Sequence, residues 1–164
     1  MQPAEVDETP IDSEDPTRLA LRLARAKAQA IAASNPGVPV LAADTVVSLE
    51  GQLLGKPQTA EENVSFIRLL SGREHIVTTG HVLLNGTDSA EEAPHTSVRF
   101  REISVSEAQR YAASGEGLDK AGGYGLQGLG GALVDTVCGC HTNVIGLSLP
   151  ATLRLFDRLG VPVA

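Results

Sequence analysis

The chain has 164 residues, of which 42% are hydrophobic, and its 20 acidic residues outnumber 13 basic ones to give a net charge of -7. This length fits one domain with its own core, while the negative charge and the 3% of aromatic residues argue against nucleic-acid binding. The acidic N-terminus resembles no signal peptide, no apolar run could span a membrane and two cysteines make no disulfide scaffold, so we expect a cytoplasmic protein.

The first third of the chain predicts a helix followed by a hairpin. Asp15 is a good N-cap and Pro16 a good first residue for a helix that ends near residues 35–37. Residues 38–49 are almost continuously apolar, as in a central strand covered on both faces. A tight turn then predicts that residues 52–54 fold back on this strand.

The middle of the chain predicts a second helix and two more strands. Thr59 and Glu62 have the spacing of a capping box that opens a helix. Residues 75–84 and 98–103 read as strands, and the acidic stretch 88–94 between them reads as a solvated loop.

The last third predicts a short helix, a glycine-rich segment, a strand and a closing helix. Ser104 and Glu107 form another capping box, residues 115–131 are dense in glycine, residues 132–137 read as a strand, and Pro150 opens the final helix. Helices and strands thus alternate, with one hairpin. This pattern predicts a three-layer α/β domain in which helices flank a mixed, twisted β-sheet.

Asp44 is the most informative single residue, because it interrupts an apolar strand in the run Ala-Ala-Asp-Thr-Val-Val. Burying a carboxylate without partners costs several kcal/mol, so Asp44 must lie at an open end, pair with a base or hold a metal. A structural carboxylate that caps a neighbouring turn is the alternative to a catalytic one.

Lys56 follows a glycine and precedes a proline, a position from which it could meet a phosphate as a point charge or simply extend into water. Residues 123–128 fit G-x-G-x-x-G, but no strand precedes them and no helical pattern follows, so we reject a dinucleotide site. A glycine-rich loop against a ligand or a tight corner fits better. In that loop, the Gln127 amide can both donate to and accept from a base edge.

The sequence offers three other candidates. The sequence pattern alone predicts that Glu8 is a solvated acid and that Lys27 lies on a helix surface. Cys138, Cys140 and His141 could form a metal site, but their close spacing makes a closed tetrahedral site awkward.

Taken in order, six segments resemble the Maf family of nucleoside triphosphate pyrophosphatases, also called septum formation inhibitor-like proteins. They are VDETP, RLALRLARAKA, LAADTVVSLEGQLLGKP, LLSGREHIVTTG, GLDKAGGYGLQGLGG and HTNVIGLSLP, and they extend over nearly the whole chain. The resemblance implies one Maf/ITPase-like domain over residues 1–164. Family members begin with a strand and an S-x-S-P-R-R loop that helps to bind the triphosphate. This sequence starts after that element, so we expect a domain truncated at its N-terminus, with its first strand missing.

The resemblance also implies residue roles and a substrate. Asp44 matches the family's proposed proton acceptor, and Glu8, Lys27 and Lys56 match charged residues of the catalytic cleft. Thr45 and Gln127 match positions linked to base choice, and their surroundings resemble the subfamily that acts on dTTP and UTP. The implied reaction cuts between the α- and β-phosphates and releases a nucleoside monophosphate and pyrophosphate.

A divalent metal, Mg²⁺ or Mn²⁺, is expected as cofactor, because it would stabilise the charge that develops on the phosphate oxygens. Glu8 and Asp44 could offer it oxygen ligands. Dimers occur in the resembled family, which gives a homodimer as an expectation. Two other functions stay open: a non-catalytic nucleotide-binding regulator linked to cell division and septum formation, and a structural domain that carries the motifs as relics.

Overall fold

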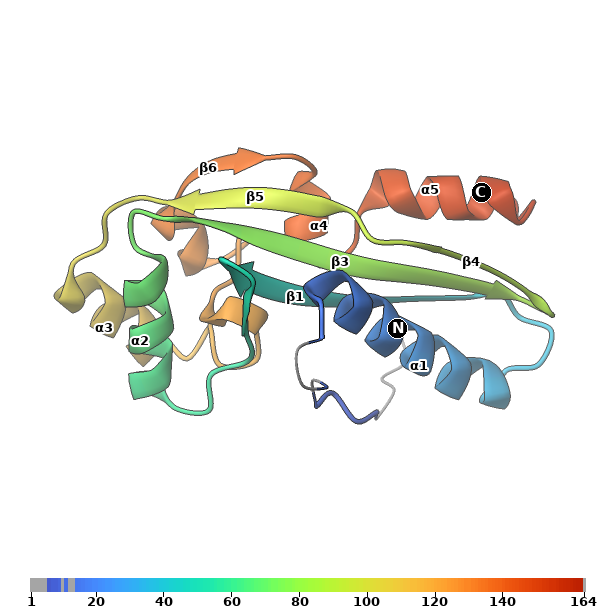
Figure 1. Ribbon diagram of the computed structural model, residues 1–164, viewed down its shortest axis with the longest axis horizontal. Helices are drawn as coiled ribbons and strands as arrows, with labels where there is room; N and C mark the ends of the chain where they lie inside the picture. Colours follow the sequence, from blue (N-terminus) through green and yellow to red (C-terminus); the bar gives the residue numbers. More distant parts are fainter. Residues whose placement is uncertain (1–5, 10, 12–13, 164) are drawn as a thin grey trace.

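The computed structural model describes residues 6–9, 11 and 14–163, and it is built on a sheet of six strands. β3 is the longest strand and lies at the centre of the sheet (Figure 1). The strands follow the order β2 (Gln52–Leu54), β1 (Val40–Leu49), β3 (Glu74–Asn85), β5 (His95–Phe100) and β6 (Val134–Cys138), and β4 (Asp88–Glu92) pairs with the far end of β3.

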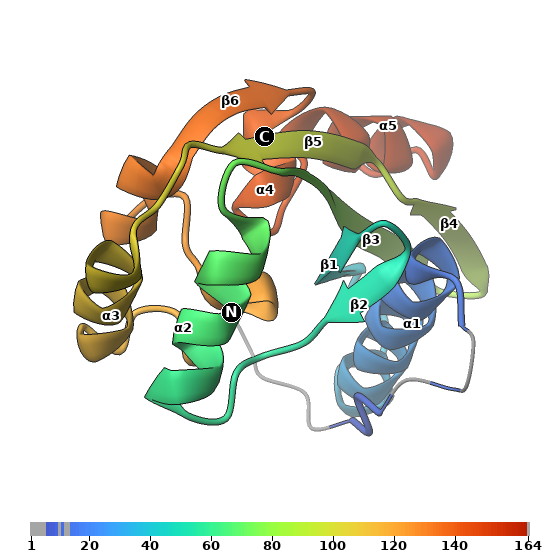
Figure 2. The same cartoon turned by 60° about the vertical axis from the view of Figure 1, so that its left-hand side comes forward.

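Helices cover both faces of this sheet, as the expected three-layer α/β class requires. α1 (Pro16–Ser34) packs on β1 and β3, whereas α4 (His141–Val144) and α5 (Leu149–Arg158) lie on the opposite face of β3 (Figure 2). α2 (Ala60–Leu70) and α3 (Val105–Ala113) pack on each other at one end of the molecule. Two 3-10 turns, η1 (Ala121–Gly123) and η2 (Leu129–Leu133), lie within the glycine-rich segment.

The helix signals in the sequence operate largely as expected. The Asp15 carboxylate accepts hydrogen bonds from the backbone N–H groups of Thr17 and Arg18, and Ser104 with Glu107 forms the full capping box. At α2, Thr59 caps the N–H group of Glu62, but the Glu62 side chain accepts from the N–H group of Gln58, one residue before the expected partner. α1, α2, α3 and α5 therefore begin within a residue of where the local sequence predicts, whereas the short helix α4 was not predicted.

The layered α/β architecture is confirmed, but every described strand pairing is antiparallel, whereas a mixed sheet was expected. The hairpin between β1 and β2 reverses the chain before α2 begins. The connection through α2 therefore brings β3 into the sheet antiparallel to β1. The alternation of helices and strands suggested that some strand pairs would be parallel. Because the short strand β2 turns the chain back before α2, β1 and β3 are antiparallel instead.

The acidic stretch 88–94 was expected to be a solvated loop, and this expectation is wrong, because β4 pairs with β3 there. Its carboxylates are neutralised by arginines far away in the sequence. Glu91 forms an ion pair with Arg25 of α1, and Glu92 forms ion pairs with Arg154 and Arg158 of α5. Opposite charges supplied by the two helices allow this acidic segment to remain an ordered strand.

Candidate active site

Asp44 lies in the middle of β1, on the face of the strand that α1 covers. Val46, two residues further on and therefore on the same face, packs against Leu19 and Leu23 of α1. Across the sheet, Asp44 lies opposite Gly80 of β3. A Cβ atom on Gly80 would lie only 2.4 Å from the backbone of α1, so the missing side chain lets this helix approach the strands closely.

The close approach of α1 brings Lys27 to Asp44, and four charged side chains then form a continuous row. Lys56 Nζ lies 2.8 Å from Glu8 Oε2, Lys27 Nζ lies 2.7 Å from Glu8 Oε1, and Lys27 also donates to Asp44 Oδ1. The row joins an N-terminal segment, α1, β1 and the loop after β2. Sequence pattern alone did not connect these residues, and the structure brings all four together.

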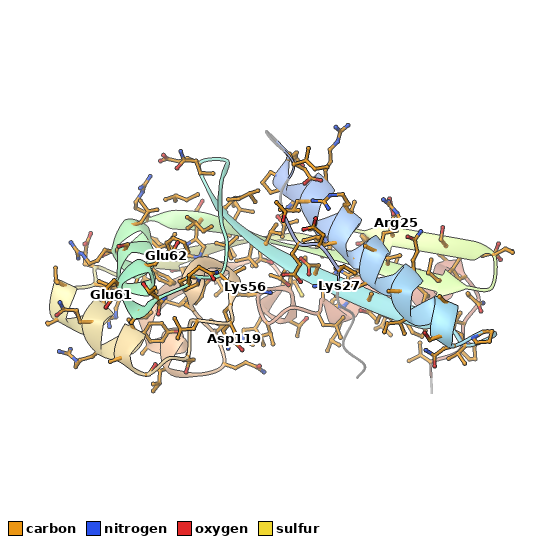
Figure 3. All side chains as sticks on the ribbon, turned by 90° about the horizontal axis from the view of Figure 1, so that it is seen from below. Arg25, Lys27, Lys56, Glu61, Glu62 and Asp119 are labelled. Atoms are coloured by element: carbon orange, nitrogen blue, oxygen red, sulfur yellow. The ribbon has the colours of Figure 1, made fainter. Side chains whose placement is uncertain are left out.

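Figure 3 shows how this row lies on the molecule. Lys27 extends from α1 and Lys56 extends from the loop before α2, on the side of the molecule that also carries Asp119. Arg25 leaves α1 in a different direction, toward the β4 end of the sheet, where it pairs with Glu91. The two lysines of the row are therefore directed to one place by the elements that carry them.

Burial and ion pairing set the protonation behaviour of the row. Burial raises the pKa of the Asp44 carboxyl above its ordinary value, and the hydrogen bond from Lys27 offsets only part of that rise. Hydrogen bonds from Lys27 and Lys56 lower the pKa of Glu8. Burial acts to lower the pKa of Lys27, but its bonds to Asp44 and Glu8 outweigh burial and raise it. Asp44 is therefore more basic than an ordinary aspartate and faces a lysine that stays charged.

Two adjoining cavities border the row. The larger has a volume of about 540 Å³ and lies between β1, the glycine-rich segment and the end of α4, while the smaller has about 330 Å³ and lies between α1 and the β1–β2 hairpin. Asp44, Thr45 and Lys56 line both. A ligand that filled both cavities would therefore pass directly over the residues expected to act in catalysis.

The two residues expected to influence base choice both line the larger cavity. Gln127 is exposed in the glycine-rich loop, and its side-chain amide has no hydrogen-bond partner within the described part of the chain. Thr45 contributes a hydroxyl from β1, and its Oγ1 lies 2.9 Å from Oγ1 of Thr79 on β3. The backbone of Gly146 at the end of α4 forms the facing wall. An amide and a hydroxyl thus border the same space.

Sequence reasoning overlooked the residues that hold the glycine-rich loop in shape. The Glu116 carboxylate accepts hydrogen bonds from the backbone N–H groups of Leu129 and Gly130, at 2.7 and 2.8 Å. Tyr124 lies beneath the loop and forms a 2.8 Å hydrogen bond with His75 of β3. A carboxylate that precedes a run of glycines was the available signal for Glu116, but its partners lie 13 and 14 residues away.

The segment that contains Cys138, Cys140 and His141 runs from the end of β6 into α4. Both cysteines are free thiols, and His141 is exposed. Across residues 6–9, 11 and 14–163, no three His, Cys, Asp or Glu side chains are gathered in a way that could hold a metal ion. Likewise, none of the helices in the described residues has the length and apolar character needed to cross a membrane.

Comparison of the sequence with known proteins identifies the family of this chain. The sequence model of the family described as Maf-like protein matches residues 1–159. A dTTP/UTP pyrophosphatase from Myxococcus xanthus is 48% identical over 160 residues, which are 98% of this chain and 81% of the relative. The protein of the same name from Deinococcus radiodurans is 47% identical over 147 residues, which are 90% of this chain and 75% of the relative.

A third relative, the dTTP/UTP pyrophosphatase of Pyrococcus furiosus, is 40% identical over 157 residues, which are 96% of this chain and 83% of the relative. The residues matched by the family model include all four members of the charged row and the residues that line both cavities. A match of this length and identity leaves one conclusion about ancestry: the chain belongs to the Maf family.

Proposed function

We propose that the chain is a nucleoside triphosphate pyrophosphatase that hydrolyses dTTP and UTP between the α- and β-phosphates. The relatives named dTTP/UTP pyrophosphatase support this substrate. The observation that carries the proposal is the row Lys56–Glu8–Lys27–Asp44 at the border of two adjoining cavities. The two lysines of the row can donate charge-assisted hydrogen bonds to a triphosphate even in a protein of net charge -7, and a divalent cation bound with the nucleotide would offset the two carboxylates.

The chemistry assigned to the row follows from its charges. A water molecule attacks the α-phosphorus, Asp44 accepts the proton of that water, and the oxygen that bridges the α- and β-phosphorus atoms leaves with pyrophosphate. The raised pKa of Asp44 brings this carboxylate closer to the range in which a general base works well. Lys27 and Lys56 stabilise the charge that grows on the phosphate oxygens. Glu8 holds the two lysine nitrogens at the cleft.

The donor chemistry of the row also suits a divalent cation. Glu8 and Asp44 both contact the Lys27 nitrogen, so two carboxylates face one cationic position. Mg²⁺ takes oxygen ligands and is commonly held by one or two carboxylates together with substrate phosphates. Glu8 and Asp44 would therefore hold Mg²⁺ or Mn²⁺, which supplies charge compensation for the triphosphate. The cation would take over part of the role that Lys27 plays toward the two carboxylates.

A pyrophosphate-release screen tests the proposal. The chain is incubated with dTTP, UTP, CTP, ATP and GTP, each with Mg²⁺, with Mn²⁺ and with a chelator. We expect release from dTTP and UTP to be fastest and to require the metal. Binding of dTTP without release of pyrophosphate would contradict the enzyme and favour a nucleotide-binding regulator. The absence of both binding and release would leave only a structural domain.

The assembly and the cellular location are two further proposals. We expect a homodimer, as in the family, and light scattering coupled to gel filtration measures it directly. We also expect the protein in the cytoplasm, where its nucleotide substrates are made, and cell fractionation with a specific antibody would test this.

A further inference from the structure

A chain of hydrogen bonds that the proposed function does not use runs from Thr45, at the wall of the larger cavity, to two buried residues, Thr79 and Asn143. Thr45 on β1 lies directly opposite Thr79 on β3, and their hydroxyl oxygens are 2.9 Å apart. The hydroxyl of Thr79 in turn donates to the backbone carbonyl of Asn143 in α4, at 2.9 Å. Thr79 and Asn143 are fully buried, whereas Thr45 lines both cavities.

The direction of this chain follows from proton counting. A threonine hydroxyl has one proton, and a carbonyl oxygen can only accept. Since Thr79 gives its proton to the carbonyl of Asn143, it has none left for Thr45. The proton between the two hydroxyl groups must therefore belong to Thr45, which donates it to Thr79. The Thr45 oxygen then has only lone pairs to offer to a ligand.

The rest of the structure keeps the chain in this direction. The side-chain amide of Asn143 donates to the Val77 carbonyl at 3.0 Å and to Thr96 Oγ1 at 3.1 Å, which fixes α4 to two strands. The Asn143 carbonyl also accepts from the N–H group of Gly146 at 3.0 Å. A Cβ atom on Gly146 would lie 3.5 Å from Thr45 Oγ1, so a larger residue there would cover the oxygen.

We propose that the chain Thr45–Thr79–Asn143 fixes Thr45 as a hydrogen-bond acceptor for the N3–H group of uracil or thymine, and that Thr79 is the positioning residue that sets this polarity. The inference rests on the proposed function, because it assumes that the base occupies the larger cavity. Uracil and thymine both carry one hydrogen-bond donor on the ring, the N3–H group. An oxygen of Thr45 that can only accept would therefore pair with N3–H. Cytosine has a lone pair at N3, which would oppose the lone pairs of Thr45.

The test compares two substitutions of Thr79, each of which changes one group of the threonine side chain. Thr79→Val keeps the shape but removes the hydroxyl, so Thr45 is free to turn and donate its proton to a ligand. Thr79→Ser keeps the hydroxyl and is the matched control. We expect Thr79→Val to narrow the ratio of kcat/KM for UTP over CTP about tenfold, or about 1.4 kcal/mol, and Thr79→Ser to preserve it.

The readout separates positioning from general damage. A purely structural role for Thr79 would lower UTP and CTP hydrolysis by the same factor and leave their ratio unchanged, and that result would overturn the proposal. If the thermal unfolding of Thr79→Val shows loss of the fold, Thr45→Val and Thr45→Ser take its place: the valine should narrow the ratio, and the serine should keep it. An unchanged ratio in Thr45→Val would be equally decisive against the proposal.

Failure of this inference is distinguishable from failure of the proposed function. If the unmodified chain hydrolyses no pyrimidine triphosphate, the proposed function itself is wrong. If it hydrolyses UTP and dTTP well while neither Thr79→Val nor Thr45→Val changes the ratio to CTP, the function holds and the polarity of Thr45 does not select the base.

Discussion

Lys27 divides its hydrogen bonds between two carboxylates, and this sharing governs the behaviour of single residues in the site. Asp44 is mostly buried, with 11% of its side chain exposed, while Glu8 is much more open at 39%. The Lys27 ammonium group therefore faces two different carboxylates: Asp44, whose pKa is raised, and Glu8, whose pKa is lowered. A pair of carboxylates in different environments is a recurrent arrangement where one must accept a proton and the other must stay charged.

At this scale, replacing Asp44 should remove turnover without unfolding the protein. Asp44→Asn keeps the shape but loses the proton acceptor, and we expect pyrophosphate release to fall about 100-fold or more. The melting temperature should change little, because Lys27 retains Glu8 as a partner. Asp135→Asn, at an exposed carboxylate on β6, is the matched control and should leave both quantities unchanged. A large drop in melting temperature for Asp44→Asn would indicate a structural role instead.

Gln127 should affect the choice of base more than the rate of chemistry. Its side-chain amide lines the larger cavity and can donate to the carbonyl oxygens beside N3–H on a uracil or thymine edge. We expect Gln127→Ala to reduce kcat/KM for dTTP and UTP more than for ATP, because groups built to pair with one base reject others. Gln109→Ala, at an exposed glutamine on α3, is the control. Equal losses for all nucleotides would show that the loop supports folding or catalysis and does not read the base.

At the scale of elements, the packing of α1 on the sheet sets the position of Lys27. Gly80 lies opposite Asp44 and directly beneath Ala20 of α1. A methyl group in Gly80→Ala would lie 2.4 Å from the helix backbone, so α1 would have to move outward. We expect a loss of about 1–3 kcal/mol of stability, together with lower activity because Lys27 moves with the helix.

Gly55→Ala is the matched control for this prediction, because a Cβ atom on Gly55 meets no other atom within 4 Å. Thermal unfolding and pyrophosphate release are measured on both variants. If Gly80→Ala melts at the same temperature as Gly55→Ala, the close approach of the helix is not needed for stability.

β3 and the glycine-rich loop are joined by a buried histidine, which predicts a pH dependence. His75 is 1% exposed, its ring lies edge-on to Phe100, and it bonds to Tyr124. Burial lowers the pKa of His75 to about 4 from 6.5. Between these values the unfolded chain binds a proton that the folded chain does not bind. The stability contribution of neutral His75 is therefore complete above pH 6.5 and is lost as the pH falls toward 4.

As the pH falls from 6.5 to 4, we expect protonation of His75 alone to lower the free energy of unfolding by about 1.4 kcal/mol per pH unit. His75→Gln should flatten the curve of stability against pH between 6.5 and 4, whereas His141→Gln, at an exposed histidine, should keep the wild-type slope. Chemical denaturation at a series of pH values measures both. Parallel curves for the wild type and His75→Gln would show that this histidine does not stay neutral in the fold.

For the whole molecule, the fold should not depend on the divalent cation. Glu8 and Asp44 already have lysine partners, so the site is electrically balanced before any metal binds. We expect a chelator to abolish pyrophosphate release but to leave the melting temperature of the nucleotide-free protein unchanged, and added Mg²⁺ or Mn²⁺ to restore release. A lower melting temperature after chelation would reveal a structural metal site and contradict this prediction.

The sequence by itself determined the features that depend on neighbours a few residues apart. The caps at Asp15 and Ser104 and the hairpin after β1 form as predicted, because a side chain within one turn satisfies the backbone. The charged residues of the site were named through the order of motifs, and an isolated carboxylate in an apolar strand marked Asp44. Glu8 and Lys27 had no such local signal, because exposed acids and helix-surface lysines are common.

The tertiary structure decided everything that depends on partners distant in the chain. The pairing of β1 with β3, the ion pairs that neutralise β4 and the link from Lys27 to Asp44 all rely on residues that lie 17 or more positions apart. The same is true of Thr79, whose partners lie 34 and 64 residues away. Charge compensation and the direction of a hydrogen bond are properties of pairs. The two residues of such a pair can be identified in the sequence, but only folding brings them into contact.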